Sequence, residues 1–106
     1  MKLTLQANTL RVTELRELNE DVADELIEGI RSALRADTEN ITLDLTQLRA
    51  IDGDTASLLR SVREEFSALE GLAWRMINPP PEARQLFELV RLHRLFEINP
   101  PRVSLT

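Results

Sequence analysis

The side chains with the clearest potential for chemistry gather in the stretch Asp52-Gly-Asp-Thr55, with Ser57 shortly after it. Asp52 and Asp54 are close enough in sequence to meet at the start of a helix, an arrangement that paired carboxylates use in acid–base catalysis. Aspartate at such a place also serves as a turn residue or an N-cap, whose oxygen accepts a hydrogen bond from a free backbone N–H. Capping is the commoner role, so this pair predicts a helix start rather than a catalytic pair.

The same stretch partly matches the D-x-D-x-T nucleophile loop of haloacid-dehalogenase-like phosphatases. The match fails twice, because Thr55 comes one place too early and the lysine that these enzymes need downstream is missing. Lys2 is the only lysine in the chain. Its position also excludes a P-loop lysine or a Schiff-base lysine deep in the chain.

Other catalytic and metal-binding patterns are missing from the sequence. The chain has no cysteine and one histidine, His93, which stands in an arginine-flanked amphipathic segment and is expected at the surface. No serine lies in a G-x-S-x-G elbow, and the three glycines do not form a G-x-G-x-x-G phosphate loop. We therefore expect no enzyme, no metal site and no cofactor.

Charge and length limit which other classes of protein the sequence can belong to. The 106 residues carry 18 acidic and 13 basic side chains, a net charge of −5, which disfavours nucleic acid as a partner. No apolar run approaches the roughly 20 residues of a membrane span, and the first residues do not resemble a secretion signal. We expect one cytoplasmic domain over residues 1–98, followed by a tail over 99–106.

Hydrophobic patterns predict the elements that position the acidic stretch. Residues 3–7 and 10–12 alternate apolar and polar side chains, which predicts two strands of a hairpin. We expect Asn8, which tolerates the left-handed backbone conformation, to form the tight turn between them. An amphipathic helix is expected over residues 19–35, with Asn19 as its N-cap. Residues 41–45 then form a strand that leads into the acidic stretch.

A second amphipathic helix begins at the acidic stretch and is expected to end at Glu70-Gly71. One of its sides carries the apolar residues Leu58, Leu59, Val62, Phe66 and Leu69. A strand over residues 72–77 follows, and a proline run then opens a third helix over residues 82–90 that buries Leu86, Leu89 and Val90. The order ββαβαβα, with a possible short last strand, predicts an α/β fold in which helices pack against a mixed sheet.

Two stretches resemble the signature of the STAS domain. Residues 41–46 (ITLDLT), Ile51-Asp52 and Leu58-Leu59 resemble a strand V/I-x-L-D-L-S followed by a loop I/V-D-S-S-G-L. Residues 78–98 (NPPPEARQLFELVRLHRLFEI) resemble the family ending N-P-x-P-x-V-R-x-L-L-E-L-T-G-L-D-R-L-F-x-I. The resemblance extends over residues 1–98, and the expected order of elements agrees with it.

The resemblance implies a bacterial anti-sigma-factor antagonist. Such proteins bind an anti-sigma factor that is also a serine/threonine kinase of the histidine-kinase-like fold. Phosphorylation of a serine at the start of the second helix abolishes binding, because the phosphate brings about −1.5 to −2 charges to the docking surface. The implied partner-binding residues are Gln47, Arg49, Asp52, Gly53, Asp54, Thr55 and Ser57.

The chain departs from the family pattern at the phosphoacceptor. D-S-S-G-L appears as Asp52-Gly-Asp-Thr-Ala56, which places Asp54 at the phosphoserine position, where this kinase chemistry cannot act. Thr55 and Ser57 are alternative phosphosites, and Thr55 is the nearer one. Asp54 either holds a switch in one charged state or caps the helix. Glu14 also replaces a glycine that is common after the second strand.

Two other functions are compatible with the same fold. One is a regulatory subunit of a transport ATPase, and the other is a module that senses a small ligand. A scaffold without any switch is a third possibility. The identity of the partner and the oligomeric state do not follow from the sequence.

Overall fold

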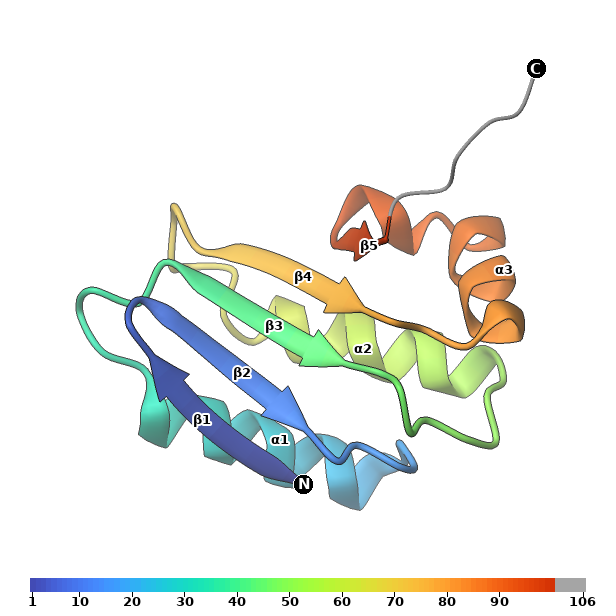
Figure 1. The fold of residues 1–106 in the computed structure, drawn as a ribbon, viewed down its shortest axis with the longest axis horizontal. Helices are drawn as coiled ribbons and strands as arrows, with labels where there is room; N and C mark the ends of the chain where they lie inside the picture. The colour runs from blue at the N-terminus through green and yellow to red at the C-terminus, as the bar shows by residue number, and fades with distance from the viewer. Residues whose placement is uncertain (101–106) are drawn as a thin grey trace.

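Five strands form one mixed sheet in the computed structural model, which describes residues 1–100 (Figure 1). The first two strands are antiparallel and the later ones run parallel, in the spatial order β1-β2-β3-β4-β5. The strands are β1 (Lys2–Gln6), β2 (Thr9–Thr13), β3 (Asn40–Asp44), β4 (Ala73–Ile77) and β5 (Glu97–Asn99). The expected mixed sheet and its short last strand are confirmed. Residues 101–106 of the expected tail lie outside the described residues.

Three α-helices and one 3₁₀ turn connect the strands: α1 (Glu20–Ala33), α2 (Gly53–Glu64), α3 (Pro81–Leu89) and η1 (Leu92–Arg94). Figure 1 shows α1 and α2 on the same face of the sheet, while no described helix covers the other face. Each of the three helices follows the carboxyl end of a parallel strand, so all three begin at one edge of the domain. This edge is where α/β sheets commonly bind ligands.

The core lies between the sheet and the two helices behind it. Strand residues that point to this face are buried, as the period of two along a strand requires. The helices supply Leu26, Ile30, Leu59 and Val62, all with no exposed surface. At the β4 end of the core Trp74 packs between Phe66 and Phe96, with ring centroids 5.8 and 5.9 Å apart. Trp74 is therefore a core residue, as its position in a strand predicts.

The second helix is shorter than its apolar pattern predicts. α2 ends at Glu64, and the chain continues to Leu69 as turns in which the N–H groups of Phe66, Ser67 and Leu69 each bond a carbonyl three residues back. These tighter turns still bury Phe66, but they rotate Leu69 toward solvent, where its side chain is 49% exposed. The expectation of a helix reaching residue 70 was wrong for this reason. Leu58 is also only half-buried, in contrast to its neighbour Leu59.

The third helix does not bury Leu89, which is 78% exposed. Ala83 and Phe87 are its buried residues and stand four positions apart on one face. Leu89 follows Phe87 by two positions, which is about 200° around a helix, and therefore points to the opposite side. Leu86 and Val90 are half-buried.

Several non-glycine residues have a left-handed backbone. In the β1–β2 turn the positive φ belongs to Ala7, at 54°, and not to Asn8 as expected. Glu14, after β2, has a φ of 58°, and Arg91, after α3, has a φ of 62°. The resemblance described above implies that both stand where the family pattern commonly has a glycine. These two residues adopt the conformation for which glycine is favoured.

Candidate functional site

A surface hollow of about 440 Å³ lies between the starts of α1 and α2. Both helices begin there because β2 and β3, the strands that precede them, are parallel neighbours. The residues that line the hollow are Leu18, Asn19, Glu20, Asp52, Asp54, Ser57 and Leu58. Three of the sequence-predicted partner-binding residues, Asp52, Asp54 and Ser57, thus come together in one place.

The α1 side of the hollow was not foreseen as part of the site. Asn19 is the N-cap of α1, as predicted, and its Oδ1 accepts a hydrogen bond from the Val22 N–H at 2.9 Å. Leu18 and Glu20 flank this cap. The predicted cap marks the start of α1, but its place beside the start of α2 depends on the parallel pairing of β2 with β3.

The α2 side is built by a capping box. Asp52 is the N-cap, and its Oδ1 accepts the Thr55 N–H at 3.1 Å. In return the Asp52 N–H donates to Oγ1 of Thr55 at 3.2 Å, and that hydroxyl lies 3.3 Å from Oδ1 of Asp52. The two side chains satisfy free backbone donors of the first turn, which defines where the helix begins.

Asp54 is exposed in the first turn of α2 and plays no part in this cap. Within residues 1–100 its carboxylate makes no hydrogen bond or ion pair. The cap is therefore Asp52 and not Asp54. A carboxylate in the first turn remains favourable, since the helix dipole stabilises it by about 0.3–1 kcal/mol.

The two alternative hydroxyls differ in exposure. Thr55 is buried, with 2% of its surface exposed, and its hydroxyl is engaged in the capping box. Ser57 is exposed and lines the hollow. A modifying enzyme would have to open the first turn to reach Thr55, whereas Ser57 is directly accessible. Gly53 has free space around it, because a Cβ built there meets no atom within 4 Å.

Gln47 and Arg49 lie outside the hollow, on the loop that leads from β3 to α2. This loop is joined to the one before α1 through Arg16. The Nε of Arg16 donates to Oε1 of Gln47 at 3.1 Å, and its carbonyl accepts the Arg49 N–H at 2.8 Å. Arg49 lines a neighbouring hollow of about 310 Å³. The contacts of Arg16 thus hold the two site loops together.

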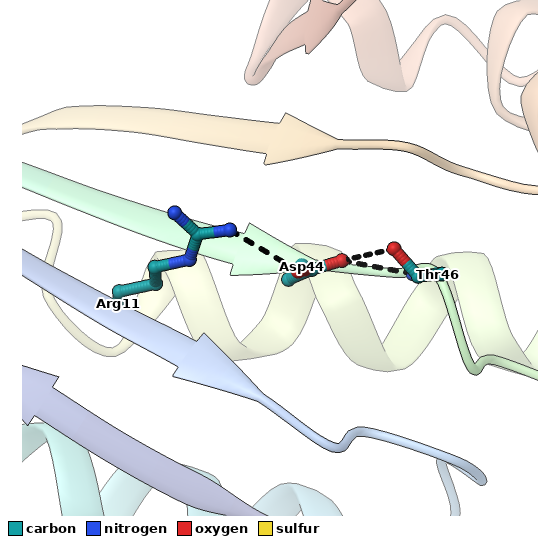
Figure 2. A network of polar contacts seen from close by, with 3 residues as sticks. All are labelled: Arg11, Asp44 and Thr46. Atoms are coloured by element: carbon teal, nitrogen blue, oxygen red, sulfur yellow. Dashed lines mark hydrogen bonds and ion pairs between the residues drawn. The ribbon is translucent and has the colours of Figure 1, made fainter.

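The β3–α2 loop starts from a polar network at Asp44 (Figure 2). The Oδ1 of Asp44 accepts the backbone N–H of Thr46 at 3.0 Å and its hydroxyl at 2.5 Å, while Arg11 Nη2 lies 3.3 Å from Oδ2. Partial burial raises the pKa of Asp44, but these bonds from Thr46 and Arg11 outweigh burial and lower the pKa below its ordinary value. Residues 44–46 therefore form a turn, closed by the hydrogen bonds from Thr46 to Asp44, at which the β3–α2 loop begins.

The chemistry of the hollow is acidic and partly apolar. All of its charged side chains are carboxylates, Glu20, Asp52 and Asp54, and its apolar side chains are Leu18 and Leu58. Such a surface complements a basic side chain with an apolar neighbour. Within residues 1–100, His93 is exposed and no group of three possible ligands is placed to hold a metal ion. In the same range no helix has the length and apolar character to cross a membrane.

Comparisons with known proteins agree with this architecture. The family model described as "STAS domain" matches residues 7–104. Six chains of solved structures match, among them the NMR structure of the protein TM1081, with a TM-score of 0.72 and 16% sequence identity. That match covers 91% of this chain and 77% of the other, and it shows a shared fold. No curated protein matches the chain.

Proposed function

The chain belongs to the STAS domain family, and on that premise we propose that it is a protein-interaction switch of the anti-sigma-factor-antagonist type. Its partner is an anti-sigma factor of the serine-kinase class, in the bacterial cytoplasm. The partner docks on the hollow between α1 and α2 and on the adjoining loop. The carrying observation is that Asp54 is an exposed carboxylate with no intramolecular partner within residues 1–100. The resemblance in sequence implies that it stands at the family's phosphoserine position.

The absence of Asp54 from the cap supports a role in binding. Asp52 and Thr55 already satisfy the start of the helix, so the fold has no evident need for a second carboxylate there. Its free oxygens are available to donors on a partner. A carboxylate carries one charge and two oxygens, fewer than a phosphate, so the partner's surface is adapted to a permanent single charge.

This proposal separates binding from the usual regulation. In related antagonists a phosphate added to serine changes the charge of the docking surface. Here Asp54 keeps that charge constant, and the accessible hydroxyl in the hollow is Ser57. Members of the family are generally binding modules, and an exposed acidic hollow suits that role.

The test begins with capture of the partner from native cells and its identification by mass spectrometry. Its affinity is then measured for wild type, Asp54→Asn and Asp37→Asn. Asp37 is the matched control, an exposed aspartate on the loop before β3, away from the hollow. We expect Asp54→Asn to change affinity by roughly fivefold or more, and Asp37→Asn to leave it unchanged. Equal affinities for all three proteins would contradict the role of Asp54.

A second arm tests regulation. Wild type and Asp54→Ser are incubated with the captured kinase and ATP, and the phosphorylated residue is identified. We expect no phosphate at position 54 of the wild type, and phosphate on the serine introduced there in the variant. Phosphate on Ser57 of wild type would move the switch to that residue. Capture of a transport ATPase instead of an anti-sigma factor would favour the alternative of a transport subunit.

A further inference from the structure

The uncovered face of the sheet carries a second arrangement of polar side chains. The strand register places Thr4, Arg11, Thr42, Arg75 and Glu97 side by side in one row across all five strands. This row lies on the face opposite to α1 and α2, because residues next to it along each strand are buried against the helices. It is therefore separate from the hollow at the start of α2.

A second hollow, of about 460 Å³, lies on this face. Its lining residues are Gln6, Ala7, Thr9, Arg11, Thr42, Arg75 and Ile77. The only charged side chains among them are the two arginines, whereas the whole chain has a net charge of −5. The lining thus presents two guanidinium groups and several hydrogen-bonding groups, while the carboxylates that pair with the arginines, Asp44 and Glu97, are not among the lining residues.

Both arginines keep donors free for a ligand. Arg11 reaches from β2 over β3, where its Nη2 contacts Asp44 at 3.3 Å (Figure 2). Arg75 uses its Nε to contact Glu97 at 2.7 Å. Within residues 1–100 each guanidinium makes this one contact, although it carries five N–H donors, and the two side chains are 50% and 40% exposed. The carboxylates hold the arginines in place without using all of their donors.

Thr42 supplies an independent observation. It stands between the two arginines on the central strand, lines the hollow, and is only 6% exposed. Within residues 1–100 its hydroxyl makes no hydrogen bond. Because Thr42 lines the hollow and its hydroxyl has no partner in that range, the hydroxyl is available to donate to a ligand oxygen.

We propose that the row Arg11–Thr42–Arg75 binds an acidic segment of a partner protein. The two arginines lie two strands apart, roughly 10 Å at about 4.8 Å for each step, which is wider than one phosphate group. Two carboxylates on one chain match this spacing, with Thr42 donating between them. The site is independent of the proposed docking at α2, so one domain can hold two proteins at once.

The test uses a ten-residue peptide of alternating Glu and Thr, which presents carboxylates on one side when extended. Binding to the full chain is followed by NMR shifts of backbone amides, with a Gln-Thr peptide as the neutral control. We expect the Glu-Thr peptide to shift residues of β2, β3 and β4 on this face, and the Gln-Thr peptide to shift none. Binding should weaken steeply with added salt, because the contact is electrostatic.

Three variants decide the assignment. Arg11→Gln and Arg75→Gln should each weaken peptide binding by roughly fivefold or more, and Thr42→Val should also weaken it. Arg31→Gln is the matched control, since Arg31 is 52% exposed, is paired with carboxylates, and lies on the other side of the domain. A dispersed NMR spectrum of each variant verifies that it is folded.

Specific outcomes would overturn the proposal. An equal loss for Arg31→Gln would show that only net charge matters. Shifts centred on the start of α2 would place the peptide in the other hollow. Saturable binding of inorganic phosphate at this face, without binding of the peptide, would reassign the site to a small anion. Failure of partner binding at Asp54 would leave these results unaffected.

Discussion

Thr55 and Asp52 hold each other through reciprocal contacts, in which the N–H of each residue donates to the side chain of the other. Thr55 is buried beneath the proposed docking surface and does not form part of its exposed area. The pair therefore determines the position of the first turn of α2, and with it the positions of Asp54 and Ser57. Changes to this pair should affect stability before they affect recognition.

Removal of the cap should destabilise the domain. Asp52→Ala is expected to lower the free energy of unfolding by roughly 0.5–2 kcal/mol, as at other N-caps. Thr55→Ala removes the second half of the box and should cost a similar amount, while Thr55→Ser keeps the hydroxyl and should cost less. Urea denaturation measures all three. A Thr55→Ser loss as large as that of Thr55→Ala would show that the methyl group, and not the hydroxyl, is what matters.

Asp44 should make the free energy of unfolding depend on pH. Its pKa is lowered in the folded chain, so its contribution is present above the ordinary pKa of 3.8 and is lost as pH falls through the folded value. Asp44→Asn should lower the free energy of unfolding at pH 7 by roughly 1–2 kcal/mol, because charge-assisted hydrogen bonds from Thr46 and Arg11 are weakened. Denaturation curves at pH 7 and pH 3 provide the measurement. The difference from wild type should shrink at pH 3, and a constant difference would contradict the titration of Asp44.

Glycine should be tolerated or favourable at the two left-handed positions that replace family glycines. Glu14→Gly and Arg91→Gly relieve a backbone strain of roughly 1–2 kcal/mol, against a loss of up to about 1 kcal/mol from greater freedom of the unfolded chain. We expect each variant to be as stable as wild type or up to about 1 kcal/mol more stable. Glu17→Gly is the control, an exposed loop residue without a positive φ. A melting temperature lowered equally in all three variants would exclude strain relief.

Adjacent leucines of α2 should respond differently to truncation. Leu59 is fully buried, so Leu59→Ala should cost roughly 2–5 kcal/mol. Leu58 is half-buried at the hollow, so Leu58→Ala should cost less and should instead weaken partner binding. Unfolding and binding assays on the same two variants test both statements. Equal destabilisation would mean that Leu58 belongs to the core, as its apolar pattern first predicted.

Alternation and capping residues were sufficient to predict most of the strands and the starts of α1 and α2. The strands follow from a period of two, and Asn19 and Asp52 mark helix starts through local hydrogen bonds that depend on nearby sequence alone. The end of α2 was missed because Phe66 is buried either by a helix or by the tighter turns that replace it. Leu89 was misplaced because an apolar side chain alone does not reveal which face of a short helix meets the core.

The sequence predicted only the part of the candidate site that lies on one continuous segment of the chain. The helix start was found from Asp52 and Asp54, which are neighbours in sequence. Leu18 and Glu20 were missed, because their place in the hollow depends on the parallel pairing of β2 with β3. The Arg11–Thr42–Arg75 row was missed for the same reason, since three strands distant in sequence supply it. Such sets follow from sheet order, which local patterns do not specify.

The central position of β3 has a consequence for synthesis of the chain on the ribosome. A nascent chain that has emerged as far as Glu64 already contains every residue of the hollow at α2. It still lacks β4, which is one of the two neighbours of β3 and runs from Ala73 to Ile77. The strand that leads into the docking loop is therefore unsupported on one side until β4 emerges. We therefore expect the proposed docking surface to reach its final form only after β4 has been translated.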